Sequence, residues 1–266
     1  ENAYMVNDII WIAPNEGQAE NLAVCYSRLD EQPDQYDRLN YFIGMYQNDK
    51  RAVTKSFRSE IKRIIMDDRD NNLVYGGLDN GRIALWDLRA QKQTPDSLSS
   101  PRDKIAFMPV IDLKKRENDI FAAALEGRLY KYDARKLYEP IFYLDLFVVS
   151  ESHSIVKLET MPTSIEFDPL DPEILYVTTT EGTIYEIGIN QNSFQEKQLF
   201  QKIANAPITC LKFMDFKNYF KDISSMRRTA SGRVKASNFF VTSSFDWNVK
   251  FFKESLGNEV AINNYH

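Results

Sequence analysis

Few side chains in this sequence are suited to catalysis or metal binding. The 266 residues include only two histidines, His153 and His266, and two cysteines, Cys25 and Cys210. Acid–base catalysis most often uses histidine, and zinc sites are built from clusters of histidine and cysteine. His153 lies in the polar stretch SESHS, which is typical of a solvated loop. We therefore expect no catalytic residue, no metal site and no cofactor, and we predict that the protein is not an enzyme.

Other features that can mark a binding site have structural explanations. Cys25 and Cys210 are flanked by apolar residues, which favours buried, reduced thiols over a disulfide. The pair Gly76-Gly77 precedes an apolar strand rather than a helix, so it does not predict a phosphate-binding loop. The sequence has no apolar run near 18 residues and no signal-peptide pattern. We expect a cytoplasmic location and no insertion into a membrane.

The dominant pattern is a sequence unit that occurs four times and consists of an apolar strand, a tight turn and a second apolar strand. Polarity alternates on both sides of each turn, which predicts a β-hairpin. A hairpin recurring along the chain predicts a repeat architecture. The four copies are LVYGGLDNGRIALWDLR (73–89), IFAAALEGRLYKYDAR (120–135), ILYVTTTEGTIYEIGI (174–189) and FFVTSSFDWNVKFFKE (239–254).

Aligning the copies on their turns brings bulky residues into columns. We expect two columns in the core, one at the end of the second strand and one three residues earlier. The first three turns use glycine, which allows the positive φ of a tight hairpin, whereas the fourth relies on Asp246 and Asn248. The columns are Trp86, Tyr132, Ile187 and Phe252, and Ile83, Leu129, Ile184 and Val249.

Each hairpin follows a further apolar run, and a less regular unit opens the chain. Strand, hairpin and outer strand make up the four-stranded blade of a β-propeller. A composition of 43% hydrophobic and 13% aromatic residues agrees with packed sheets. We predict an all-β propeller with about five blades visible, as part of a seven-bladed ring. Residues 1–266 are expected to form one domain, which is incomplete.

An insertion at residues 216–238 departs from the repeat. It carries six basic residues against Asp222 alone, in a chain whose net charge is −5. A flexible solvated loop explains such composition, and a docking loop, a regulatory segment or a nucleic-acid contact are the functional alternatives. The segment MRRTAS resembles a basophilic kinase site, with Arg227 and Arg228 before Thr229 and Ser231. Because the whole chain is acidic, we expect no nucleic-acid partner.

Several of these motifs resemble dynein intermediate chains, which are WD-repeat propeller proteins. NFFVTSSFDWNVKFF matches the family's Ser-Ser-x-Asp-Trp-x-Val-Lys pattern, and VYGGLDNGRIALWDLR matches its Gly-Gly strand with a Trp-Asp ending. NDIIWIAPN and the turn from Thr180 to Tyr185 follow the family order as well. The family-motif residues are Ser243, Ser244, Asp246, Trp247 and Lys250.

The resemblance also has departures. Trp86-Asp87 is the one Trp-Asp ending among the four copies, and no Gly-His pair begins a unit. The His-Ser-Trp-Asp hydrogen-bond network of many WD repeats therefore cannot form, and blade stability is expected to rest on apolar packing. The sequence VTSSFDW, which includes Asp246 and Trp247, favours a divergent cytoplasmic form over axonemal or intraflagellar forms.

The resemblance implies a non-catalytic subunit of a motor complex. Its propeller would dock on the dynein heavy chain tail, while other dynein subunits and dynactin would bind through a region not present in residues 1–266. This places the protein on microtubules of the cytoskeleton, in cargo transport. The alternative is a WD-repeat adaptor of another assembly, such as a vesicle coat or a ubiquitin ligase.

Overall fold

The chain folds entirely into strands and connecting loops wherever the structure describes it. The computed structural model describes residues 3–12, 21–29, 41–47, 50–100, 108–146, 161–169, 171, 173–189, 194–200, 204–214, 239–245, 249–253 and 263–265. These residues contain 20 strands and no helix, and hence none long and apolar enough to cross a membrane. The all-β prediction is confirmed.

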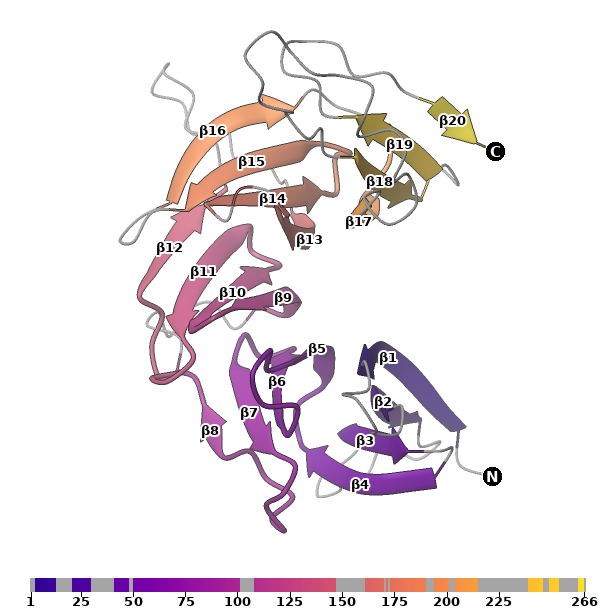
Figure 1. Cartoon of the computed structure of the whole chain (residues 1–266), viewed down its shortest axis with the longest axis vertical. Helices are drawn as coiled ribbons and strands as arrows, with labels where there is room; N and C mark the ends of the chain where they lie inside the picture. Colours follow the sequence, from indigo (N-terminus) through magenta and orange to yellow (C-terminus); the bar gives the residue numbers. More distant parts are fainter. Residues whose placement is uncertain are drawn as a thin grey trace, which may run out of the picture. The chain divides into compact units, whose positions relative to one another are not determined.

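The strands form five four-stranded antiparallel sheets, and each sheet keeps its strands in chain order (Figure 1). The four predicted hairpins are the second and third strands of the last four sheets, and the apolar run before each hairpin is the first strand. The sheets are β1 (Ala3–Ile12), β2 (Asn21–Leu29), β3 (Tyr41–Gln47) and β4 (Lys50–Phe57); β5 (Ile61–Met66), β6 (Leu73–Leu78), β7 (Ile83–Asp87) and β8 (Ser97–Leu98); β9 (Val110–Arg116), β10 (Asp119–Ala124), β11 (Arg128–Asp133) and β12 (Phe142–Asp145); β13 (Pro162–Phe167), β14 (Ile174–Thr179), β15 (Ile184–Ile189) and β16 (Phe194–Phe200); and β17 (Ile208–Met214), β18 (Phe239–Ser244), β19 (Val249–Lys253) and β20 (Asn263–Tyr265).

The chain divides into two compact units, Glu1–Met161 and Pro162–His266. The first unit holds three sheets, whose first strands β1, β5 and β9 contact one another in series. The second unit holds two sheets, and β13 contacts β17. We call these five first strands the inner strands. The sequence predicts one domain over residues 1–266, and this stays a prediction.

The hairpin turns have the predicted backbone geometry. Gly81, Gly127 and Gly182 have φ values of 75°, 85° and 80°, in the region where residues with a Cβ are strained. The preceding pair Gly76-Gly77 is needed for a different reason. A Cβ on Gly76 would lie 2.7 Å from the indole ring of Trp86, and a Cβ on Gly77 would lie 2.6 Å from Val110. These two glycines therefore make room for packing within the second sheet and against the third.

The predicted core columns are mostly buried. In the first unit, Ile83 packs with Val110 and Leu113 of the next inner strand, and in the second unit Ile184 packs with Ile208 and Leu211. Phe252 lies in β19, but its side chain is outside the described residues. Six column residues are at most 1% exposed: Trp86, Tyr132, Ile187, Ile83, Leu129 and Ile184.

The prediction that Val249 is buried is wrong, because 40% of its surface is exposed. Val249 occupies the same column as Ile83 and Ile184, each of which is covered by the inner strand of the following sheet. Val249 belongs to the fifth sheet, and no described sheet follows it in the chain. The strand itself keeps the same pairing as β7 and β15.

Candidate functional site

The residues considered for chemistry do not form a reactive cluster in the described part of the chain. Cys25 is buried, its Sγ lies 3.6 Å from the carbonyl oxygen of Ile61, and burial raises its pKa to about 12. Cys210 lies on β17 and is half-buried. Among the described residues, no group of three or more His, Cys, Asp or Glu side chains could hold a metal ion. His153 and His266 fall outside these residues.

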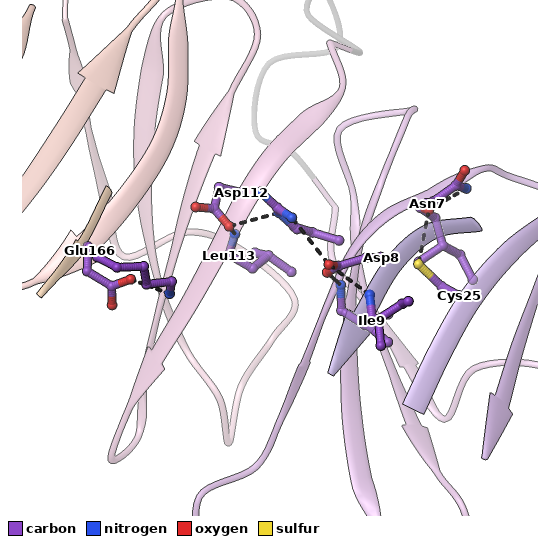
Figure 2. Close-up of polar contacts among 11 residues, drawn as sticks. Asn7, Asp8, Ile9, Cys25, Asp112, Leu113 and Glu166 are labelled. Atoms are coloured by element: carbon purple, nitrogen blue, oxygen red, sulfur yellow. Dashed lines mark hydrogen bonds and ion pairs between the residues drawn. The ribbon is translucent and has the colours of Figure 1, made fainter. Parts of the chain in front are cut away.

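Three inner strands of the first unit are instead joined by a line of charged side chains (Figure 2). Arg63 on β5 lies between two carboxylates. Its Nη1 is 3.2 Å from Asp8 Oδ1 on β1, and its Nε is 3.2 Å from Asp112 Oδ1 on β9. The side chains are 33%, 13% and 7% exposed for Arg63, Asp8 and Asp112. We call this set the inner-strand ion triad.

Backbone donors complete the contacts of the two carboxylates. Asp8 accepts hydrogen bonds from the N–H groups of Ile9 and Ile64, both at 3.0 Å, and Asp112 accepts one from Leu113 at 2.9 Å. The bond to Ile64 crosses from the first sheet to the second. Charge-assisted bonds are the stronger class of hydrogen bond, so the triad fixes the spacing of β1, β5 and β9.

A β-bulge that recurs in the inner strands determines the position of the triad residues. In every inner strand the pairing register shifts by one residue, which leaves one bulged residue, in the middle of β1 and at the second residue of the other four. Asp8, Arg63 and Asp112 each directly follow the bulge. In the second unit this position holds Ser164 and Cys210, so the triad does not continue. The bulged residues are Asn7, Lys62, Ile111, Thr163 and Thr209.

In the second unit, side-chain hydroxyl groups form hydrogen bonds at the bulged residues. Thr163 Oγ1 lies 2.8 Å from Thr178 Oγ1, and Thr209 Oγ1 lies 2.7 Å from Ser243 Oγ. Thr178 and Ser243 occupy the same position in β14 and β18. Ser244 donates a 3.4 Å hydrogen bond to the carbonyl oxygen of Ala206. The first two residues of the family motif therefore link β18 to β17 and to the segment before it.

The other predicted site residues cannot be placed in the same detail. Asp246 and Trp247 lie outside the described residues, and Lys250 is described only as part of the backbone of β19. The insertion at 216–238, with Arg227, Arg228, Thr229 and Ser231, also lies outside them. Their roles in the family motif and in regulation stay predictions.

At the opposite ends of the inner strands, a buried aspartate and tyrosine recur eight residues apart. Tyr75 donates a 3.3 Å hydrogen bond to Asp67, and Tyr176 donates a 3.4 Å bond to Asp168. In the following turn, Asp67 also accepts hydrogen bonds from the backbone N–H groups of Arg69 and Asp70, and Asp168 accepts one from Asp171. Burial, followed by the charge of Asp67, raises the pKa of Tyr75. The pair closes the turn between the first two strands of the second and fourth sheets.

The Trp-Asp ending has a local role as well. Asp87 accepts two bonds from the Arg89 guanidinium, both 2.9 Å long, and one from the Arg89 backbone N–H. Asp133 and Arg135 repeat these contacts in the third sheet. The bond to the arginine side chain lowers the pKa of both carboxyl groups. Both carboxylates therefore bind groups within their own turns.

No family model matches the chain. Human dynein axonemal intermediate chain 2 is 26% identical over 183 residues, which cover 66% of this chain and 29% of that protein. Dynein intermediate chain 3, ciliary, from Heliocidaris crassispina is 28% identical over 174 residues, which cover 62% of this chain and 28% of that protein. This chain is thus similar to dynein intermediate chains over about two thirds of its length. The matches span less than a third of either relative.

A solved structure defines the fold. The crystal structure of Saccharomyces cerevisiae Sqt1 is similar over 94% of this chain and 59% of the Sqt1 chain, with a TM-score of 0.64 and 12% identity. The fold is a WD-repeat β-propeller, as the sequence predicted. At this level of identity, Sqt1 carries information about the fold alone.

The sequence reasoning missed the inner-strand ion triad and the Asp–Tyr pairs. A signal for the triad was present, because NDIIW, IKRII and VIDLK each place one charge directly before an aliphatic residue in an inner strand. A charge at such a position needs a partner when it is buried. The partner lies on a neighbouring sheet, so it cannot be found from one repeat.

Proposed function

We propose that this chain is a non-catalytic intermediate chain subunit of a dynein motor complex. Its propeller docks on the tail of a heavy chain and helps to link the motor to cargo adaptors for movement along microtubules. The similarity to two dynein intermediate chains over about two thirds of this chain is the observation that carries the proposal. The carboxylates of the inner-strand ion triad and those of Asp87 and Asp133 have structural partners, which agrees with a binding role rather than turnover.

The third sheet offers a surface on which docking can be tested. Its outer strand β12 and the segment before it expose Tyr138, Ile141 and Tyr143, with 66%, 44% and 45% of their surface accessible. Arg128 lies over the Tyr143 ring at 5.1 Å and is 2.7 Å from Asp145. Tyrosine and arginine are enriched in protein interfaces, where they often carry most of the binding energy. We assign this patch to the heavy chain tail.

Co-purification tests both parts of the proposal. A tagged copy of this chain should retain a heavy chain from an extract that contains dynein, and should bind a purified heavy chain tail. Replacing Tyr138 and Tyr143 with aspartate should weaken binding at least tenfold, about 1.4 kcal/mol. Replacing Arg227 and Arg228 with serine serves as the control, with folding of every variant checked by circular dichroism.

The result also selects the subclass. The motif around Asp246 and Trp247 favours the cytoplasmic form. The two similar proteins, by contrast, are named as axonemal and ciliary dynein chains. Recovery with axonemes would assign the chain to a ciliary dynein, and recovery with a soluble dynein complex would assign it to the cytoplasmic form. If the folded chain binds no heavy chain tail of either kind, the motor proposal fails and a general adaptor role replaces it.

A further inference from the structure

The outer strand β12 is an edge of the third sheet. The strand order is β12-β11-β10-β9, so β12 pairs with β11 alone among the described strands. An edge strand presents backbone N–H and C=O groups to which a strand of another chain can pair, and very short edge strands prevent such pairing. The outer strand of the second sheet, β8, has two residues, whereas β12 has four. The edge of the third sheet is therefore the longer of these two.

The pairing register shows which backbone groups of β12 point outward. At the end of the ladder, the N–H of Leu146 donates a 2.8 Å hydrogen bond to the carbonyl oxygen of Gly127. This pair continues the register that β12 keeps along β11. Hydrogen-bonded and non-hydrogen-bonded pairs alternate along an antiparallel ladder. The backbone groups of Leu144 are therefore directed toward β11, and those of Tyr143 and Asp145 are directed away from the sheet.

The side chains of these two outward residues are also exposed. Tyr143 is 45% exposed and the Asp145 side chain is 44% exposed, whereas Phe142 and Leu144 are half-buried. Arg128 lies over the Tyr143 ring and forms an ion pair with Asp145, so one cation orients both side chains. A carboxylate has about four lone-pair sites, so Asp145 can accept a further donor. A partner would meet a preorganised aromatic ring and carboxylate two residues apart.

We propose that the heavy chain tail adds an extended segment to β12, as a fifth strand of the third sheet. This inference rests on the proposed function and states how the tail binds the patch. A β-branched or aromatic residue of the segment lies opposite Tyr143, because such cross-strand pairs are favourable. A lysine or arginine two residues away lies opposite Asp145, which supplies the complementary charge. Backbone pairing provides affinity, and these two side chains provide specificity.

Proline substitutions test the backbone pairing. Asp145→Pro removes an outward N–H, whereas Asp145→Asn keeps it, and both variants lose the ion pair with Arg128. Proline is tolerated on an edge strand where its nitrogen faces solvent, so both variants should fold, as checked by circular dichroism. The purified heavy chain tail should bind Asp145→Pro about tenfold more weakly than Asp145→Asn. Tyr143→Pro, compared with Tyr143→Val, repeats the measurement at the second outward residue.

Peptides give a second measurement with the unaltered chain. Among short overlapping peptides from the heavy chain tail, one with the expected residue pattern should bind and should compete with the whole tail. N-methylation of that peptide at alternate residues should abolish binding, whereas methylation of the residues between them should have little effect. This period of two follows from the alternation of bonded groups along a strand.

The outcomes separate this inference from the docking proposal. If the tail binds and each proline variant binds it as well as its matched variant, strand addition is overturned while docking on the patch stands. Binding of a peptide without a period of two in the methylation series also overturns strand addition alone. If the tail does not bind the unaltered chain, both proposals are overturned.

Discussion

At the scale of single residues, Trp86 shows packing in this chain where many WD repeats have a polar network. Its indole is fully buried, the ring meets Phe57 edge-on at 5.9 Å, and within the described structure Nε1 has no hydrogen-bond partner. Trp86→Ala should lower the free energy of unfolding by about 3–5 kcal/mol. Trp86→Phe should cost less than half of that, because it keeps the ring contact and removes an unpaired N–H, which costs about 1–3 kcal/mol when buried. Urea unfolding measures both, and equal losses would contradict the packing explanation.

Cys25 provides a second test at this scale. Burial, and then the negative charge of Asp8, raise its pKa from 9.0 to about 12. Because the reactive form is the thiolate, Cys25 should stay unlabelled by a thiol reagent at pH 8 until the protein unfolds, while half-buried Cys210 reacts first. The folded state holds the thiol proton more tightly, so this group lowers stability as the pH rises from 9 towards 12. Labelling of a Cys210→Ser variant under native conditions would argue against the burial.

At the scale of elements, the Asp–Tyr pairs should make equal contributions in both units. Tyr75→Phe and Tyr176→Phe each remove one hydroxyl that donates to a buried aspartate, and both rings are 2% exposed. Each change should cost about 0.5–1.5 kcal/mol, the usual net value of one hydrogen bond. Tyr138→Phe is the control, since that side chain is 66% exposed. A loss at only one of the two buried sites, measured by thermal unfolding, would show that the pairs are not equivalent.

The sequence predicted those elements whose information is local. Alternating polarity and the glycines at 81, 127 and 182 determine the hairpins, and these were found where expected. The exposure of Val249 and the partners of Arg63 were not predictable, because both depend on a neighbouring sheet. The bulges also interrupt the alternating apolar pattern by which an inner strand is recognised in the sequence. They place apolar residues three apart, as at Ile61 and Ile64, where an even strand would place them two apart.

At the scale of the molecule, the inner-strand ion triad should couple the three sheets of the first unit. Arg63→Met removes the cation that lies between Asp8 and Asp112. The loss should be about 1–3 kcal/mol, less than for a fully buried pair, because one third of the Arg63 side chain reaches solvent. Hydrogen exchange should accelerate in β1, β5 and β9. Exchange in β14 of the second unit should stay unchanged, and a uniform acceleration would contradict this view of the triad.

The bulge has a further consequence for how such chains vary in length. In each inner strand the bulged residue, such as Lys62 or Thr163, is inserted between residues that already alternate correctly between the two faces. Its deletion would restore plain alternation, whereas a deletion elsewhere in the strand would turn core residues to the opposite face. Single-residue gains and losses should therefore be tolerated at the bulge before anywhere else in these strands. In a sequence alignment of distant relatives, a gap placed at the bulge keeps core residues aligned with core residues.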